Sequence, residues 1–165
     1  MPEKKRILIV DAFGYGAAQV ARSVYEKFFS AYQSSLELIF CKSAEEAIDW
    51  ISENGKPDAM VVQNRIMYGV GVDPLSKSTD PELKEAGIRL IQFIRTTMAF
   101  KNLWIVGLAS CRQDLQPLKD VVGECGNVLT VPYDPKQLVT FLCHQLGIDT
   151  SSAVNSSTTR QTAQT

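Results

Sequence analysis

Polar side chains that could do chemistry stand where short apolar runs end. Asp11 follows the run Ile7–Val10, and the carboxamides Gln63 and Asn64 follow Met60–Val62. A carboxamide is a poor nucleophile, and it offers no charge to a divalent cation, which prefers anionic oxygen ligands. Asp11 can cap a turn by accepting hydrogen bonds from nearby backbone N–H groups. These residues therefore predict neither a covalent catalyst nor a metal site.

Two further apolar runs end in uncharged residues. Trp104–Leu108 is followed by Ala109–Ser110, and Val128–Val131 is followed by Pro132–Tyr133. If the runs are strands of a doubly wound sheet, ligands bind beyond their carboxyl ends. These residues, with those at the first two ends, are therefore where a site is expected.

The glycines after the first run leave a second interpretation open. Gly14 and Gly16 begin a dinucleotide-binding pattern, but the third glycine would stand at position 19, where the chain has Gln19. The acid expected after the second strand is also missing, since Cys41 and Lys42 stand there. A flavodoxin-like domain that binds a small molecule or nucleotide at the strand ends remains the alternative function.

The apolar pattern alternates between strand and helix five times. Continuous aliphatic runs predict buried parallel strands, and helical spacing of apolar residues predicts a helix after each run. The predicted strands are Ile7–Val10, Leu36–Phe40, Met60–Val62, Trp104–Leu108 and Val128–Val131. Such alternation predicts an α/β fold with a doubly wound five-stranded parallel sheet and helices on both faces.

Capping residues mark the helix ends. Ser43 and Glu46 form a capping box that begins the second helix, and Gly55 is its expected stop. Asp134 and Pro135 provide an N-cap and an N1 proline for the last helix.

Four segments, in order, resemble the receiver domains of two-component response regulators. Ile7–Asp11 resembles their first strand and leading acid, and Pro57–Val62 the strand that delivers their phospho-acceptor aspartate. Gly87–Arg95 resembles their third helix, and Val131–Pro135 the Lys-Pro-Phe segment before their last helix. The resemblance covers residues 4 to 147, and it implies strand order 2-1-3-4-5, a receiver-like arrangement, and a cis Val131–Pro132 peptide bond.

The residues that carry receiver chemistry are largely absent. The family holds magnesium with an acidic pair and phosphorylates an aspartate, whose phosphoryl group meets a Ser or Thr and a Lys. The corresponding, degenerate positions here are Asp11, Ala12, Gln63, Ala109 and Val131. If the correspondence with the receiver pattern is shifted by one residue at this strand end, Ser110 supplies the hydroxyl group. Without the acceptor and the lysine, we expect no phosphorylation, no enzymatic activity and no cofactor.

The resemblance then implies a module that binds another signalling protein. Tyr133 holds the position of an aromatic residue that reports the state of the receiver site, and here we expect it to keep one rotamer. The stretch of about 65–87 is an expected insertion after the third strand, and its Tyr68 and Val70 are further candidate interaction residues. The sequence leaves the oligomeric state open, a homodimer included.

Composition excludes several other classes. Seventeen basic and 18 acidic residues give a net charge of -1, so no positive field predicts binding to nucleic acid or a membrane. The chain has no signal-peptide pattern, and its four cysteines are scattered, which favours free thiols in the cytoplasm. Residues 1–148 are predicted to form the domain, and 149–165 a disordered polar tail.

Overall fold

The computed structural model describes residues 3–11, 18–65 and 86–151. Within them, five parallel strands form one sheet in the order β2-β1-β3-β4-β5. The strands are β1 (Lys5–Val10), β2 (Leu36–Cys41), β3 (Ala59–Gln63), β4 (Trp104–Ala109) and β5 (Gly126–Thr130). The predicted fold class and strand order are confirmed.

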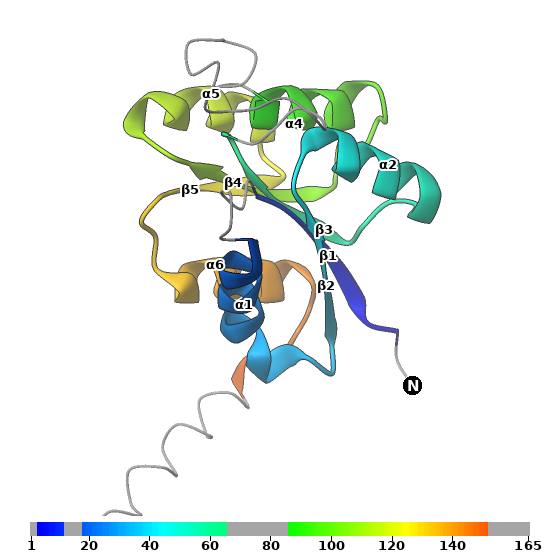
Figure 1. The fold of residues 1–165 in the computed structure, drawn as a ribbon, viewed down its shortest axis with the longest axis vertical. Helices are drawn as coiled ribbons and strands as arrows, with labels where there is room; N and C mark the ends of the chain where they lie inside the picture. Colours follow the sequence, from blue (N-terminus) through cyan, green and yellow to red (C-terminus); the bar gives the residue numbers. More distant parts are fainter. Residues whose placement is uncertain (1–2, 12–17, 66–85, 152–165) are drawn as a thin grey trace, which may run out of the picture.

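Helices cover both faces of the sheet (Figure 1). On one face lie α1 (Ala18–Phe28), the short 3-10 helix η1 (Ser30–Tyr32) and α6 (Pro135–Gln145). On the other face lie α2 (Ala44–Asn54), α4 (Ala86–Thr96) and α5 (Arg112–Val122). The helical connections between successive strands return the chain to the start of the next strand, so all strands end at the same edge.

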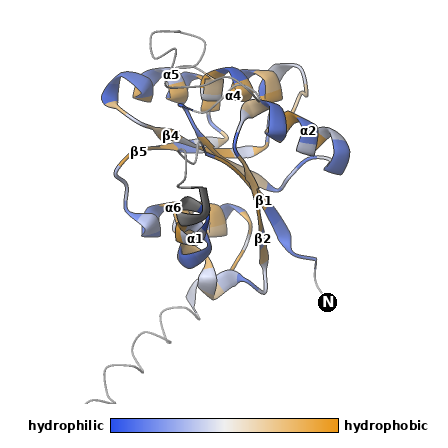
Figure 2. Cartoon of the chain, viewed as in Figure 1, coloured by the Kyte–Doolittle hydropathy of each residue, from blue (hydrophilic) through white to orange (hydrophobic). Residues whose placement is uncertain are grey.

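The sheet separates two hydrophobic cores. Because strand side chains alternate, Leu8 and Val10 of β1 pack under α2 and α4, whereas Ile7 and Ile9 pack under α1 and α6. Figure 2 shows the central strands as an apolar layer, with hydrophilic residues on the outward faces of the helices. This alternation also determines which strand-end side chains share a face.

The predicted helix caps are present. The Ser43 hydroxyl accepts a hydrogen bond from the Glu46 backbone N–H at 3.1 Å, and Glu46 in turn accepts one from the Lys42 N–H at 2.7 Å. Asp134 caps α6 by accepting from the Lys136 N–H at 2.9 Å. Gly55, with φ of 84°, ends α2 as expected, since glycine adopts this left-handed conformation without strain.

The fifth strand begins earlier than predicted, at Gly126 rather than Val128. Gly126 lies opposite Ile105 in β4, and a Cβ atom at this position would overlap the Ile105 carbonyl oxygen. A close backbone approach is thus permitted by a residue that has low strand propensity. The apolar pattern of the sequence could not reveal this earlier start of β5.

Some predictions concern residues outside the described ranges. They include Ala12, Gly14 and Gly16, most of the insertion with Tyr68 and Val70, and the tail from 152 onward. Among the helices that are described, none has the length and apolar character needed to cross a bilayer.

Candidate functional site

Asp11 and Gln63 lie side by side at the carboxyl edge of the sheet. Strands β1 and β3 are paired in parallel, and Val10 lies opposite Val62. One residue further on, the same register places Asp11 next to Gln63, at the usual spacing of adjacent strands, about 4.8 Å. The sequence prediction that these strand ends share one site agrees with this register.

A cavity of about 390 Å³ opens at this point between α1, the strand ends and the segment after β5. Its lining is mostly apolar and aromatic, and consists of Asp11, Val24, Tyr25, Phe28, Gln63, Leu108, Val131, Pro132 and Tyr133. Asp11 is the only charged residue in this set. The cavity is therefore an apolar space with one acid in its wall.

Asp11 belongs to a short chain of hydrogen bonds. The Tyr25 hydroxyl donates to Asp11 Oδ2 at 2.6 Å, and the hydroxyls of Tyr25 and Tyr133 are hydrogen-bonded to each other. Burial raises the pKa of Asp11, and the hydrogen bond from Tyr25 offsets only part of that shift. Burial also raises the pKa values of Tyr25 and Tyr133, so both phenols stay protonated at neutral pH. Among the described residues of the lining, none supplies a cation to pair with Asp11.

The two carboxamides are buried and incompletely paired. Asn64 is 1% exposed, and neither its Oδ1 nor Gln63 Oε1 meets a hydrogen-bond donor among the described residues. The Asn64 backbone is well held, since its N–H donates to the Leu108 carbonyl at 3.0 Å and its carbonyl accepts from Gly87 at 2.8 Å. Buried acceptors without donors are uncommon in folded proteins, so these oxygens are candidates for ligand contact.

Strand register separates the candidates for the hydroxyl position. Leu108 lies opposite Gln63 and lines the cavity. Ala109, the predicted position, is fully buried in the core on the opposite face, under α2, α4 and α5. Ser110 is one residue further along and is not part of the lining. The residue beside Gln63 on the cavity face is therefore Leu108, whereas Ala109, the position expected from the sequence, faces the other core.

Val131 and Tyr133 border the cavity from the segment after β5. Val131 is 40% exposed, and the Val131–Pro132 peptide bond is cis, as predicted. Tyr133 lines the cavity and is hydrogen-bonded with Tyr25, so its ring faces α1 rather than solvent. That Tyr133 keeps a single rotamer stays a prediction.

A cation near the end of β3 is already neutralised. Arg65 Nε donates to Asp114 Oδ2 at 3.1 Å, and Arg65 Nη2 lies 3.5 Å from the Cys111 sulfur. The Asp114 side chain is only 12% exposed, so this pair is partly shielded from solvent. It joins β3 to α5, and Arg65 does not line the cavity with Asp11.

Sequence reasoning missed the α1 side of the cavity. Val24 and Phe28 fit the apolar spacing of an amphipathic helix, which predicts core packing alone, and Tyr25 was not singled out. Nothing in the sequence relates Tyr25 to Asp11, because they are 14 residues apart and meet only through the packing of α1 on the sheet.

Two of the cysteines, Cys41 and Cys143, are buried and poorly suited to act as nucleophiles. All four are free, and burial raises the pKa of Cys41 to about 12 and that of Cys143 to about 11. A thiol with such a pKa is protonated at neutral pH and reacts slowly. No group of three or more potential metal ligands forms among the described residues.

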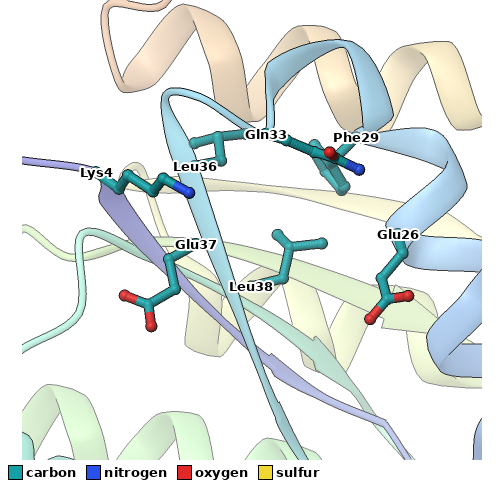
Figure 3. Close-up of a pocket in the computed structure, with 7 residues that line it drawn as sticks. All are labelled: Lys4, Glu26, Phe29, Gln33, Leu36, Glu37 and Leu38. Carbon is teal, nitrogen blue, oxygen red and sulfur yellow. The ribbon is translucent and has the colours of Figure 1, made fainter.

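A second cavity, of about 330 Å³, lies beside the edge strand β2 (Figure 3). Its two acids, Glu26 and Glu37, lie on opposite sides of β2 in that view. Glu26 is also paired with Arg22 at 3.0 Å. The charged groups do not converge on one point, so this cavity is the weaker candidate.

The comparisons with known proteins concern the fold. No protein-family model and no curated protein matches the sequence. A two-component response regulator from Clostridium difficile is 18% identical, with a TM-score of 0.60, over 87% of this chain and 96% of that chain.

Two further solved structures give similar values. A response regulator receiver domain protein from Methanospirillum hungatei is 13% identical, with a TM-score of 0.61, over 88% of this chain and 95% of that chain. The receiver domain of a signal transduction histidine kinase from Syntrophus aciditrophicus is 13% identical, with a TM-score of 0.61, over 87% of this chain and 90% of that chain. The chain has the fold of response-regulator receiver domains.

Proposed function

We propose that this chain is a degenerate receiver domain that binds another signalling protein without being phosphorylated. The observation that carries the proposal is Gln63, which ends β3 beside Asp11 where a receiver has its phospho-acceptor acid. Its neighbours on the cavity wall are Leu108 and Val131, which supply neither a hydroxyl nor an ammonium group.

Chemistry at these residues argues against phosphoryl transfer. A carboxamide cannot form the acyl phosphate that a carboxylate forms, and Asp11 alone gives a magnesium ion one anionic ligand. Val131 is apolar at the position of the receiver lysine, so no cation there would offset the charge of a phosphoryl group.

The partner surface that we propose comprises α5, β5 and α6. Strand β5 is an edge of the sheet, and four of its five residues are half-buried, whereas β1 and β3 are almost fully buried. An edge strand between two helices offers unpaired backbone groups to a partner. Gln63 is not an acid, so its charge cannot change by phosphorylation. This surface is therefore either always able to bind the partner or controlled by something other than phosphate.

The phosphorylation test uses acetyl phosphate with magnesium and intact-mass detection. We expect no added phosphoryl mass on the wild-type chain. The matched comparison restores the receiver chemistry with Ala12→Asp, Gln63→Asp, Leu108→Thr and Val131→Lys in one variant. Stoichiometric, acid-labile phosphorylation of the wild-type chain would contradict the proposal.

The surface test uses a partner captured from the native cell on the immobilised chain. Charge reversal on the proposed surface, Lys119→Glu with Lys136→Glu, should weaken capture by about tenfold or more. The control is Lys101→Glu, an exposed change of the same kind outside the surface. Tyr133→Ala should also weaken capture, whereas Gln63→Asp should change it little. Equal capture by all these variants would exclude this surface.

A further inference from the structure

We propose that the cavity beside Asp11 binds a small organic cation, a primary or secondary amine attached to an apolar body. The inference rests on the lining of the cavity, and it does not depend on the partner surface or on the absence of phosphorylation. It would give the domain a ligand, and thus a way of being controlled, in place of phosphate.

The first argument is the charge of Asp11. It is the only charged residue among the described residues of the lining, and its Oδ2 accepts a hydrogen bond from Tyr25. A carboxylate in a largely apolar wall loses solvation without gaining a counter-charge. An ammonium group in the cavity would supply that counter-charge directly.

The second argument is the excess of hydrogen-bond acceptors. Gln63 Oε1 is buried and has no donor among the described residues, and Gln63 lines the same cavity as Asp11. The Tyr25 hydroxyl gives its single proton to Asp11. A ligand that carries two or three N–H donors would satisfy both acceptors. An anionic ligand would meet acceptors and a like charge, and should be rejected.

The third argument is the shape and character of the walls. The rings of Tyr25, Phe28 and Tyr133 line the cavity, and aromatic faces attract cations as well as apolar groups. Val24 and Val131 are 41% and 40% exposed, so the rim is apolar as well. The volume of about 390 Å³ falls within the range of about 300–1,000 Å³ for small-molecule sites.

The same lining suits an organic cation better than a divalent metal ion. Magnesium and calcium need several oxygen ligands, usually with more than one carboxylate, and the cavity wall contains one. The hydrated ion would also gain nothing from the aromatic rings. An alkylammonium needs only one carboxylate and apolar surroundings for its body.

The test compares three probes of the same shape that differ in charge. These are 2-phenylethylamine, 2-phenylethanol and 3-phenylpropanoate, each titrated at pH 7 into the isotope-labelled full chain, with amide NMR shifts as the readout. We expect the amine to bind about tenfold or more tightly than the alcohol, as a charge-assisted hydrogen bond implies, and the acid not to bind. Shifts should centre on Asp11, Gln63 and Tyr133. Magnesium chloride should cause no comparable shifts.

Two variants test the role of the charge. Asp11→Asn should reduce amine affinity by about tenfold or more, whereas Asp49→Asn, an exposed acid on α2, should leave affinity unchanged. Val131→Lys keeps Asp11 but places a tethered ammonium at the rim, so it should also weaken amine binding. Equal affinity for amine and alcohol, or for Asp11→Asn and the wild-type chain, would overturn the proposal, as would the absence of amine binding at millimolar concentration.

Discussion

Two partly buried charges in this domain, Arg95 and Asp11, have opposite surroundings. Arg95, at the end of α4, donates to five backbone carbonyl groups at 2.5 to 3.2 Å, those of Phe100, Lys101, Leu103, Val122 and Cys125. Within the part of the chain that the structure describes, the Asp11 side chain accepts one hydrogen bond, and none of the residues in the cavity wall is a cation.

The difference separates a structural charge from a candidate ligand contact. The guanidinium of Arg95 joins the loop before β4 to the end of α5 and to Cys125, whose carbonyl also accepts from the Ile105 backbone N–H at 3.1 Å. Asp11 joins nothing comparable, and its desolvation disfavours the ionised form. Charges that weaken the fold and lie in a cavity are typical of functional sites.

The largest expected effect comes from removing the structural charge. Arg95→Met should lower the free energy of unfolding by about 3 kcal/mol, because five hydrogen bonds to backbone carbonyl groups are lost at once. Urea unfolding followed by circular dichroism measures the change. The control is Lys119→Met, an exposed charge on α5, which should shift stability by less than about 0.5 kcal/mol. A loss below about 1 kcal/mol for Arg95→Met would remove the contrast with Asp11.

Adding a second acid beside Asp11 should have the next largest effect. Gln63→Asp should destabilise the domain by about 2 kcal/mol at pH 7, because two carboxylates would lie on neighbouring strands in an apolar wall. The loss should shrink as the pH falls toward about 4, since protonation removes the repulsion. Gln33→Asp, an exposed change, is the control for unfolding measured at both pH values. A pH-independent loss would show that repulsion is not its cause.

Removing the charge of Asp11 should stabilise the domain. Because the folded-state pKa of Asp11 is raised, its contribution to stability is full at low pH and is lost as the pH rises through that pKa. Asp11→Asn should therefore gain about 1 kcal/mol at pH 7, or about 2–4 °C in Tm, and almost nothing near pH 4.

The nearby phenols do not confuse this measurement, because Tyr25 and Tyr133 titrate far above that pH range. Thermal unfolding of Asp11→Asn and of the control Asp49→Asn, from pH 4 to 7, gives the comparison. A loss of stability at pH 7 for Asp11→Asn would mean that the hydrogen bond from Tyr25 outweighs desolvation.

The smallest effect should come from supplying the missing cation. Val131→Lys should stabilise the domain by about 0.5 kcal/mol at pH 7, since the rim is exposed enough for water to screen the pair. The sharper readout is the pKa of Asp11, followed by carbon NMR of its carboxyl group, which should fall relative to the wild-type chain. Val131→Met is the neutral control. An unchanged pKa would place the new ammonium outside the cavity.

Much of the fold could be predicted from the sequence. The run Ile7–Val10 is aliphatic at every position, so only a strand buried on both faces suits it. Ser43 and Asp134 mark their helix starts because each side chain competes locally for free N–H groups. The expectation that Gln63 and Val131 do not support receiver chemistry also came from the sequence, because it depends on which residue types are present at the strand ends.

The cavity itself could not be predicted from local pattern. Tyr25 reaches Asp11 only because α1 packs on the face toward which Gln63 also points. Register, not local sequence, placed Leu108 beside Gln63 and turned Ala109 to the other core. Residue types and spacings thus determined the helices and strands and the functional groups at the strand ends, since both can be read along the chain. Only the tertiary structure decided which side chains surround Asp11, because those contacts join segments that are far apart in sequence.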